Sequence, residues 1–383
     1  MTEITEITLG ELGQSGFLHL GDGYRTKQSE YGVPGLPILR VAEVLDGKIS
    51  PKFEDYVRDT FRSTMGAKIS QPHDVVLTTK GTVGRVAIMT EDAPQFVYSP
   101  QLCFFRIRPG SPVSARYLYY WFKSDYFLSQ ARHRKSQTDM ADYINLADIK
   151  SLTIKLPSEK TSDALTAVLG ALDDKIATNE QITCHLTELV ATHFLAAMRC
   201  AQYSTTLQKI VDLKYGKALT KDNRSLGPVP IYGSNGISGW HQIPLVHGPG
   251  IIVGRKGANA GSVSWSQVPF WAIDTAFYVT PRFAHIPNEF LFSLLSNLQL
   301  RHLVGDSAIP GLNREAALAC EVALPASDTI DQFTKIARSA LATQAQLSAE
   351  SRALSQLRDT LLPKLMSGEL RVRDAEKVVE EVT

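Results

Sequence analysis

Two similar segments place a lysine, glycines and small polar residues directly after an apolar run. They are TTKGTVG, residues 78–84, and GRKGANAG, residues 254–261. Glycine lets a backbone approach a ligand closely, and these polar side chains suit phosphates and base edges. Either copy alone fits an ordinary hairpin turn with a solvated lysine, but two copies favour a binding role. The candidate donors are Thr79, Lys80, Thr82, Arg255, Lys256 and Asn259.

A second basic segment is RHRKSQTDM, Arg132 to Met140, matched by RHLVGDSAIPGL from Arg301 to Leu312. Such a run can follow a phosphate backbone, or it can be the solvated end of a helix. Its candidate residues are Arg132, Arg134, Lys135, Gln137 and Thr138. In YGSNG, Ser234 and Asn235 have the side chains to read bases, although an Asn-Gly hairpin turn fits better.

Recognisable catalytic motifs are absent from the sequence. It contains no GxxxxGK[ST] phosphate loop, GxGxxG, HExxH, GxSxG or Asn-Pro-Pro-aromatic segment. Cys184, His185 and His193 lie close together, but their spacing matches no usual zinc site. We therefore expect no catalytic residue and no metal site, and a duplicated unit without convergent acid, base or nucleophile points to binding.

The candidate segments belong to a long internal repeat. NLADIKSLTIKLP, from Asn145 to Pro157, returns as NREAALACEVALP from Asn313 to Pro325, and each copy runs into a heptad-patterned helix. The offset of 168 residues is a whole number of heptads, so the apolar register of one helix maps onto the other. The repeat predicts two globular units that do the same task at different places, each followed by one long helix.

The apolar stripes of the two helices need a partner, and the nearest is each other. The residues expected to pack in this helix pair are Leu165, Val168, Leu172, Ile176, Leu186, Leu189, Phe333, Ile336, Leu347, Leu354, Leu357 and Leu361. Antiparallel pairing would hold the globular units at opposite ends of a rod of roughly 60 Å, since about 40 residues rise 1.5 Å each. A plain spacer or an oligomer contact is the alternative. Asn179 replaces a leucine on the stripe, where it either fixes the register or faces solvent.

The expected fold is α+β, with two duplicated, mostly β domains and two long antiparallel coiled-coil helices. The proposed boundaries are 1–157 for the first domain, 158–202 for the first helix, 203–325 for the second domain and 326–383 for the second helix and tail. Strands are expected near 37–44, 74–79, 84–89, 102–109 and 151–156, and again near 229–235, 250–257, 261–266 and 276–281. Further helices are expected over 114–134 and 288–304. Pro363 and Gly368 are expected to close the second long helix.

Composition indicates a soluble chain in a reducing compartment. Of its 383 residues, 44% are hydrophobic, and its four cysteines form no CxxC pair. No segment is long and apolar enough to cross a bilayer, so we expect no membrane contact. The overall charge is +1, but the proposed globular domains carry +2 and +3 and the helical segments −3 and −1. This small bias would bring the domains rather than the helices to a polyanion.

Taken together, these features resemble the specificity subunit of type I restriction-modification systems. The resemblance spans the chain and includes two divergent units with their helices, the KGxxG segment between strands, the later N(x)11P segment and the ending LLPKLMSGELRV. It implies a noncatalytic cytoplasmic DNA reader of prokaryotes. Each domain would contact one half of a bipartite site in double-stranded DNA, and the helices would set the spacing.

The resemblance also implies partners. Two methylation subunits would bind around the helices and carry S-adenosylmethionine and the adenine methyltransferase site, while nuclease and translocase subunits would use ATP and Mg. No cofactor is expected in this chain, and whether nuclease subunits accompany it stays open. The alternative function is a duplicated module for a non-DNA ligand, or a scaffold, built on a coiled coil.

Overall fold

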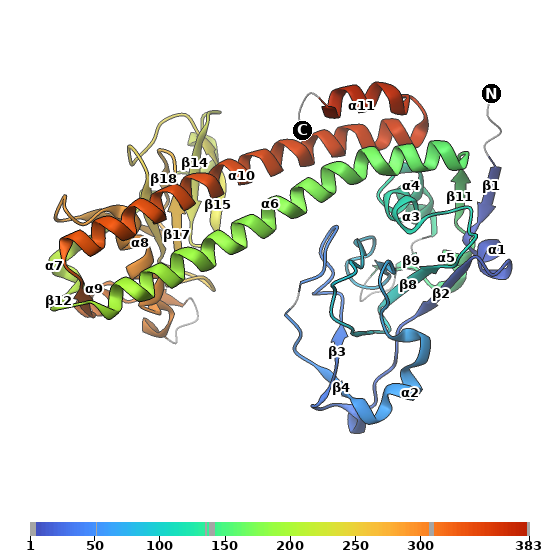
Figure 1. The fold of residues 1–383 in the computed structure, drawn as a ribbon, viewed down its shortest axis with the longest axis horizontal. Helices are drawn as coiled ribbons and strands as arrows, with labels where there is room; N and C mark the ends of the chain where they lie inside the picture. The colour runs from blue at the N-terminus through green and yellow to red at the C-terminus, as the bar shows by residue number, and fades with distance from the viewer. Residues whose placement is uncertain (1–4, 51, 135, 138–141, 306–309, 381–383) are drawn as a thin grey trace. The chain divides into compact units, whose positions relative to one another are not determined.

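The structure is a computed structural model, and it describes residues 5–50, 52–134, 136–137, 142–305 and 310–380. Figure 1 shows the chain as a ribbon. The chain divides into two compact units. Unit 1 comprises residues 1–176 and 353–383, and unit 2 comprises residues 177–352. Each unit therefore contains one globular domain and a part of each long helix.

The domain of unit 1 is built mainly from short strands. They are β1 (Thr5–Thr8), β2 (Leu18–Asp22), β3 (Gly35–Leu39), β4 (Tyr56–Arg58), β5 (Val75–Thr78), β6 (Val86–Ile88), β7 (Val97–Tyr98), β8 (Leu102–Ile107), β9 (Ser136–Gln137), β10 (Asp142–Tyr143) and β11 (Thr153–Leu156). The helices are α1 (Leu9–Gln14), α2 (Arg62–Met65), α3 (Ala115–Phe122), α4 (Asp125–Arg134) and α5 (Leu146–Lys150), with 3-10 turns η1 (Gln28–Glu30), η2 (Asp59–Phe61) and η3 (Gly66–Lys68).

The domain of unit 2 repeats this order. Its strands are β12 (Tyr203–Thr206), β13 (Val211–Tyr215), β14 (Val229–Gly233), β15 (Gly236–His241), β16 (Gly250–Gly254), β17 (Val263–Ser266), β18 (Trp271–Ala272), β19 (Ala276–Pro281), β20 (Val304–Gly305), β21 (Gly311–Leu312) and β22 (Glu321–Leu324). Its helices are α7 (Leu207–Ile210), α8 (Asn288–Asn297) and α9 (Arg314–Ala319), with η4 (Lys221–Asn223) and η5 (Leu300–Leu303).

The sheets of the two domains have the same topology. A four-stranded sheet has the order β2-β8-β5-β6 in unit 1 and β13-β19-β16-β17 in unit 2. A three-stranded sheet has the order β4-β3-β7 in one and β15-β14-β18 in the other, and the pairs β9-β10 and β20-β21 also correspond. In both domains the first strand pairs antiparallel with the last, β1 with β11 and β12 with β22. The predicted duplication is therefore confirmed at the level of strand order.

The two domains differ most between β3 and β4. In unit 1 these strands are joined by residues 40–55, whereas β14 and β15 of unit 2 are joined by Ser234 and Asn235 alone. The longer connection has its own apolar contacts, since Val44 is buried in a cluster with Val76, Ala87 and Tyr98.

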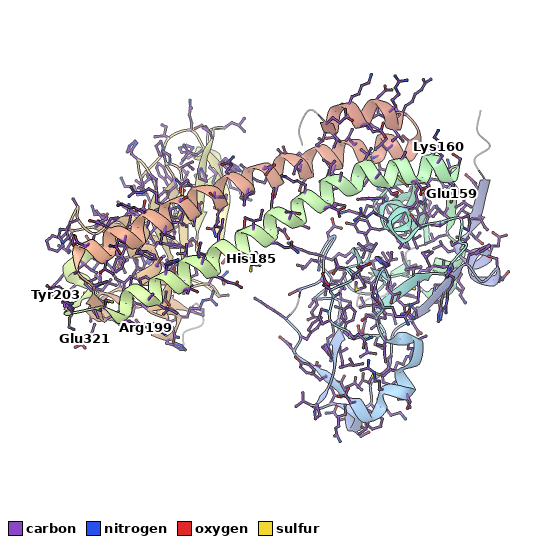
Figure 2. The ribbon with its side chains drawn as sticks, viewed as in Figure 1. Glu159, Lys160, His185, Arg199, Tyr203 and Glu321 are labelled. Carbon is purple, nitrogen blue, oxygen red and sulfur yellow. The ribbon has the colours of Figure 1, made fainter. Side chains whose placement is uncertain are left out.

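The two long helices are α6 (Glu159–Arg199) and α10 (Ser327–Ser367). Figure 2 marks the start and end of α6 by Glu159 and Arg199. In unit 1 the beginning of α6 shares a core with the end of α10, and in unit 2 the end of α6 shares a core with the beginning of α10. The helices are therefore antiparallel in each unit, as predicted from the stripes.

Most predicted packing residues lie in these cores. Leu165, Val168, Leu172, Leu354 and Leu361 are buried in unit 1, and Ile176 and Leu357 pack against them. In unit 2 Phe333 is buried, while Leu186, Ile336 and Leu347 are half-buried.

Leu189 departs from the predicted stripe, because its side chain is 44% exposed. In unit 2 the buried face of α6 follows Val190, Phe194 and Ala197. A residue next to Val190 is rotated by about 100° around a helix with 3.6 residues per turn, so Leu189 points away from this face.

Asn179 lies in the interior of unit 2 and is 2% exposed. Its Nδ2 donates to Glu350 Oε2 at 2.9 Å and to Ser351 Oγ at 3.3 Å. It therefore packs against α10 and does not face solvent; its role in fixing the register stays a prediction.

Several predicted helix boundaries change. The stretch 114–134 forms α3 and α4, because Ser124 accepts a hydrogen bond from Phe127 N at 3.3 Å and starts a second helix. The stretch 288–304 likewise breaks into α8 and η5 at Gln299, whose φ is +48°.

Pro363 does not end α10, which continues to Ser367. Leu361, Leu362 and Leu365 are buried and hold these last turns in the core. The helix stops before Gly368, whose φ of +79° suits glycine at this position. A short unpredicted helix, α11 (Val372–Glu380), follows and buries Ala375 and Val379 in the same core.

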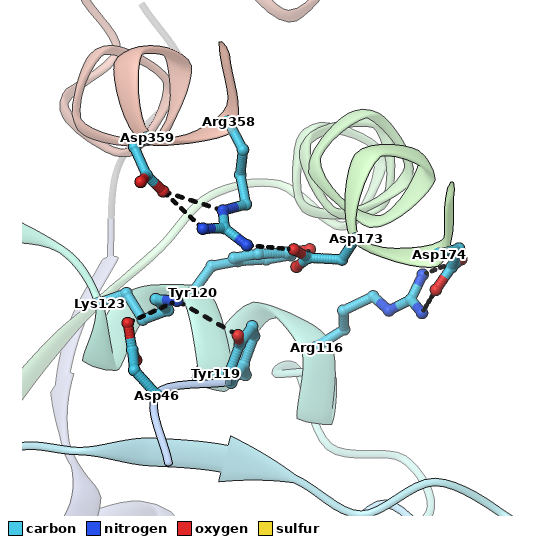
Figure 3. A network of polar contacts seen from close by, with 9 residues as sticks. All are labelled: Asp46, Arg116, Tyr119, Tyr120, Lys123, Asp173, Asp174, Arg358 and Asp359. Carbon is cyan, nitrogen blue, oxygen red and sulfur yellow. Dashed lines mark hydrogen bonds and ion pairs between the residues drawn. The ribbon is translucent and has the colours of Figure 1, made fainter. Parts of the chain in front are cut away.

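A network of polar contacts joins α3 to both long helices within unit 1 (Figure 3). Tyr120 donates its hydroxyl to Asp173 Oδ2 at 2.7 Å, and Arg358 Nη1 donates to Asp173 Oδ1 at 2.7 Å. Arg116 forms two hydrogen bonds with Asp174, at 2.6 and 3.0 Å.

The pKa values in this network follow from burial and pairing. Burial, with the nearby charge of Asp173, raises the pKa of the Tyr120 hydroxyl. Burial disfavours the charged form of Arg358, but its hydrogen bonds to Asp173 and Asp359 outweigh burial and raise its pKa. The hydrogen bond to Asp174 raises the pKa of Arg116. At neutral pH the Tyr120 hydroxyl therefore stays neutral, Arg116 and Arg358 stay charged, and all three act as structural contacts.

Within the described residues, no helix combines the length and apolar character needed to cross a membrane.

Candidate nucleic-acid interface

The first Lys-Gly segment forms a tight turn between β5 and β6. Thr78, the last residue of β5, donates its backbone N–H to Arg85 O at 2.9 Å. Gly84 N donates to Thr78 O at 3.0 Å. Gly81 and Gly84 have φ angles of +76° and +99°, which favour glycine. Lys80 is left exposed at the turn.

The second Lys-Gly segment forms the corresponding turn between β16 and β17. Gly254 N donates to Ser262 O and Gly261 N donates to Gly254 O, both at 2.8 Å. A Cβ at Gly254 would lie 2.3 Å from Asn259 O, so only glycine fits there. Gly257 has a φ of +88°, and Lys256 before it is exposed.

The two lysines also have equivalent neighbours. Lys80 forms an antiparallel bridge with Tyr143 of β10, and Lys256 forms one with Gly311 of β21. Ile144 N donates to Thr79 O at 3.0 Å, and Leu312 N donates to Arg255 O at 2.9 Å. In each domain the turn therefore lies beside a two-stranded hairpin, and this hairpin overlaps the second segment predicted above.

Sequence reasoning missed this pairing of each turn with a hairpin strand. The available signal was that Tyr143 and Gly311 are separated by 168 residues, the offset of the repeat.

The hairpin turn of Ser234 and Asn235 lies against the second Lys-Gly turn. Asn259 Nδ2 donates to Asn235 Oδ1 at 3.0 Å, and Ser262 Oγ donates to Ser234 O at 3.2 Å. The preferred interpretation of these residues as a turn is confirmed by the β14–β15 pairing. Asn235 is exposed, and its hydrogen bond with Asn259 holds its side chain beside the Lys256 segment.

Comparison with known proteins adds to this geometry. Residues 1–188 match the family model described as type I restriction modification DNA specificity domain. The chain therefore contains a domain of the type I restriction-modification specificity family. It is a sequence-specific DNA-recognition subunit of such a system.

Three solved structures are similar to the chain, and the first of them shares its fold. The S subunit of a type I restriction-modification system from M. genitalium is 17% identical, with 95% of this chain and 96% of that chain covered and a TM-score of 0.62. The HsdS subunit from Thermoanaerobacter tengcongensis is 14% identical, with 96% and 97% covered and a TM-score of 0.38. A chain from a study of assembly and conformational transition of the type I R-M system is 13% identical, with 97% and 100% covered and a TM-score of 0.40. No curated protein matches the chain.

The side chains of two predicted DNA-contact residues make hydrogen bonds or ring contacts within their own domain. Thr79 is 6% exposed and its hydroxyl donates to Gln101 O at 2.8 Å. Arg255 is half-buried, donates to Asp274 O at 2.8 Å and stacks 4.8 Å from the ring centre of Tyr215. Each is the first residue after a strand, where the backbone turns and the side chain donates to a nearby carbonyl oxygen. We therefore remove Thr79 and Arg255 from the candidate contacts.

The remaining candidate residues differ in exposure. Lys80, Thr82, Arg132, Asn235 and Lys256 are exposed, while Ser234 and Asn259 are half-buried beside them. Lys135 and Thr138 lie outside the described residues, as do the side chains of Arg134 and Gln137.

No group of three or more His, Cys, Asp or Glu side chains is placed to hold a metal ion in the described ranges.

Proposed function

We propose that each domain of this specificity subunit reads one half of a bipartite, asymmetric DNA target. The observation that carries the proposal is the equivalent placement of Lys80 and Lys256, each in a glycine turn beside a two-stranded hairpin. Two domains of one topology offer the same kind of surface twice, which suits two separated half-sites on one duplex.

The proposed contacts divide by their chemistry. Lys80, Lys256 and Arg132 suit phosphates, because an ammonium or guanidinium group neutralises the backbone charge. Thr82, Ser234, Asn235 and Asn259 carry hydroxyl or amide groups suited to base edges in a groove. Phosphate contacts would position each domain, and the amide and hydroxyl groups would choose the sequence.

We further propose that α6 and α10 set the separation of the two half-sites and bind two methylation subunits. Those partners would carry S-adenosylmethionine and transfer its methyl group to adenine, so this chain would itself be noncatalytic. Nuclease and translocase subunits that use ATP and Mg would act on unmethylated DNA where they are present. The near-neutral charge of the chain fits a reader that gains affinity from partners around the duplex, since few phosphate contacts leave solitary binding weak and salt-sensitive.

The proposal is tested by DNA selection from a random library with the methylation complex that contains this chain. Lys80→Ala and Lys256→Ala should each weaken binding, and loss of one phosphate contact should lower the salt slope by about 1. Lys209→Ala is a matched control, because exposed Lys209 precedes Val211, which pairs with Pro281 at the end of β19 remote from the Lys256 turn. Undiminished binding by both variants would contradict the proposed role of the turns.

A second arm separates base reading from positioning. Asn235→Ala and Asn259→Ala should change the bases chosen in one half-site and leave the other half-site unchanged, because each domain reads alone. A contiguous selected motif, or a change in both halves, would contradict the assignment of one domain to one half-site.

A further inference from the structure

Unit 2 contains an apolar groove that lies apart from the Lys-Gly turns. Its volume is about 500 Å³, and its walls come from the domain and from both long helices of that unit. Ile237, Trp240 and Val268 line it, and each is 47% exposed. Trp265 and Phe292 form a further aromatic wall, with their ring centres 5.6 Å apart. Three half-exposed large apolar side chains at one groove mark an interaction surface.

The edge of a sheet borders this groove. β17 is the terminal strand of its sheet, paired with β16 on one side, and Trp265 to Val268 line the groove. A terminal strand presents backbone N–H and C=O groups that can pair with another strand. The groove therefore offers an apolar wall and a strand edge together.

The corresponding edge in unit 1 is occupied by the chain itself. β6 is the terminal strand there, and Gly47 N donates to Val86 O at 2.8 Å with a parallel bridge between Gly47 and Ala87. Asp46 forms an ion pair with Lys123 Nζ at 3.3 Å (Figure 3).

The helices next to these two edges correspond as well. A Cβ added at Gly47 would lie 3.0 Å from the hydroxyl of Tyr119, the fifth residue of α3. The fifth residue of α8 is Phe292, which lines the groove. The edge that residues 44–49 cover in unit 1 is therefore the counterpart of the edge that is open in unit 2.

The reason for the difference is the length of one connection. The segment that pairs with β6 comes from residues 40–55, and the connection between β14 and β15 has only two residues. Unit 2 thus keeps the receiving edge and the aromatic wall, but its own connection is too short to fill them.

We propose that this groove binds an extended segment of a partner protein, with an apolar residue next to a carboxylate, as an added strand on β17. Strand addition to a sheet edge is a common mode of peptide recognition, in which side-chain pockets give specificity. Arg352 is the one charged residue of the lining, so it selects an acidic segment, as Lys123 pairs with Asp46 in unit 1. A single cation in an apolar lining does not suit a nucleic acid, and this inference is independent of the proposed DNA contacts.

The first test adds a synthetic peptide of residues 41–53 to the full chain. Saturable binding, followed by calorimetry and by the fluorescence of Trp240 and Trp265, is the expected result. Among residues 264–267, hydrogen exchange should slow at the amides that point away from β16, since an added strand pairs with these and protects them. Absence of saturable binding, or binding without protection of these amides, would overturn the proposal. Concentration-dependent self-association through the groove would also overturn it in favour of a second copy of this chain.

Substitutions in the groove locate the binding. Val268→Glu should weaken the peptide about tenfold, since an apolar contact is replaced by a charge that repels the acidic segment. Phe283→Glu is the matched control, because Phe283 is also 47% exposed but lies outside the groove lining. Equal weakening by both variants would overturn the assignment to the groove.

An exchange of charges tests the acidic preference. Arg352→Glu should weaken the peptide, and the same variant should prefer a peptide with Asp46→Lys. This reversal cannot come from misfolding, because misfolded protein would bind neither peptide. Failure of the charge-exchanged pair to recover affinity would overturn the proposed carboxylate contact.

Discussion

The domains of the two units contact their long helices through different chemistry. In unit 1 a polar layer of Tyr120, Asp173 and Arg358 joins α3, α6 and α10. In unit 2 Phe194 of α6, Phe290 of α8 and Phe333 of α10 lie with ring centres 5.6 to 5.8 Å apart. The same topology is thus held in one unit partly by hydrogen-bonded charges and in the other by aromatic packing.

The difference is clearest at positions related by the repeat. Shifting Asp173 forward by 168 residues gives Leu341, and shifting Arg358 back by 168 gives Val190. Both apolar residues line the groove of unit 2. The positions of the polar layer of unit 1 therefore correspond to apolar groove residues in unit 2. The duplication preserved strand order and helix pairing, while the chemistry of the junctions diverged.

The outer ion pairs of the two junctions show the opposite arrangement of charge. In unit 1 Arg116 belongs to the domain and Asp174 to the long helix. In unit 2 Glu289 belongs to the domain and Arg338 to the long helix, with Arg338 Nε 2.6 Å from Glu289 Oε1. Each domain therefore carries a charge that suits its own helix and repels the helix of the other repeat at the equivalent face.

The largest effect is expected from the aromatic junction. Phe290→Ala should lower the free energy of unfolding by about 3 to 5 kcal/mol, because it leaves a cavity among fully buried rings. Denaturant unfolding measures the loss, and Phe283→Ala, at a 47% exposed side chain, is the control with little change. Equal losses from the two variants would show that the aromatic cluster does not hold unit 2 together.

The second-largest loss of stability is expected from the polar layer of unit 1. Asp173→Ala should cost about 2 kcal/mol, since Arg358 and Tyr120 lose their shared acceptor in a partly buried place. Asp174→Ala removes the neighbouring carboxylate, whose side chain is 61% exposed, and should cost about 0.5 kcal/mol. If chemical denaturation gives the larger loss for Asp174→Ala, the layer is not the main polar contact.

The smallest effect is expected at the ion pair of unit 2. Glu289→Arg alone should destabilise by about 1 kcal/mol, because it faces Arg338, and Glu289→Arg with Arg338→Glu should recover most of the loss. Salt should reduce both effects, since the side chain of Arg338 is 63% exposed and its charge is screened. A double variant no better than the single one would contradict a direct pairing of the two charges.

Much of the fold follows from local pattern. The repeat of Asn145–Pro157 at Asn313–Pro325 and the heptad stripes predict two similar domains and an antiparallel helix pair, and the structure confirms the duplication and the pairing. The first strands, β1 and β12, were not predicted, because each pairs with a strand far along the chain and has little apolar pattern of its own. Long-range pairing leaves no such local signal.

The candidate interface could be predicted only in part. The glycines of the Lys-Gly turns signal positive φ angles, and these are found at Gly81 and Gly257. The loss of Thr79 and Arg255 as candidates depends on their contacts with Gln101 and Tyr215, which lie far from them in sequence. Spacing identifies residues able to bind, but packing decides which of them are free to do so.

Methylome sequencing tests most directly whether the two similar domains of this chain each read half of a DNA target. Cells that contain the methylation subunits would be compared with and without this chain. We expect methylated adenines in one bipartite motif, with two specified parts and an unspecified spacer, only when the chain is present. An unchanged methylation pattern, or a chain-dependent motif that is contiguous, would contradict it.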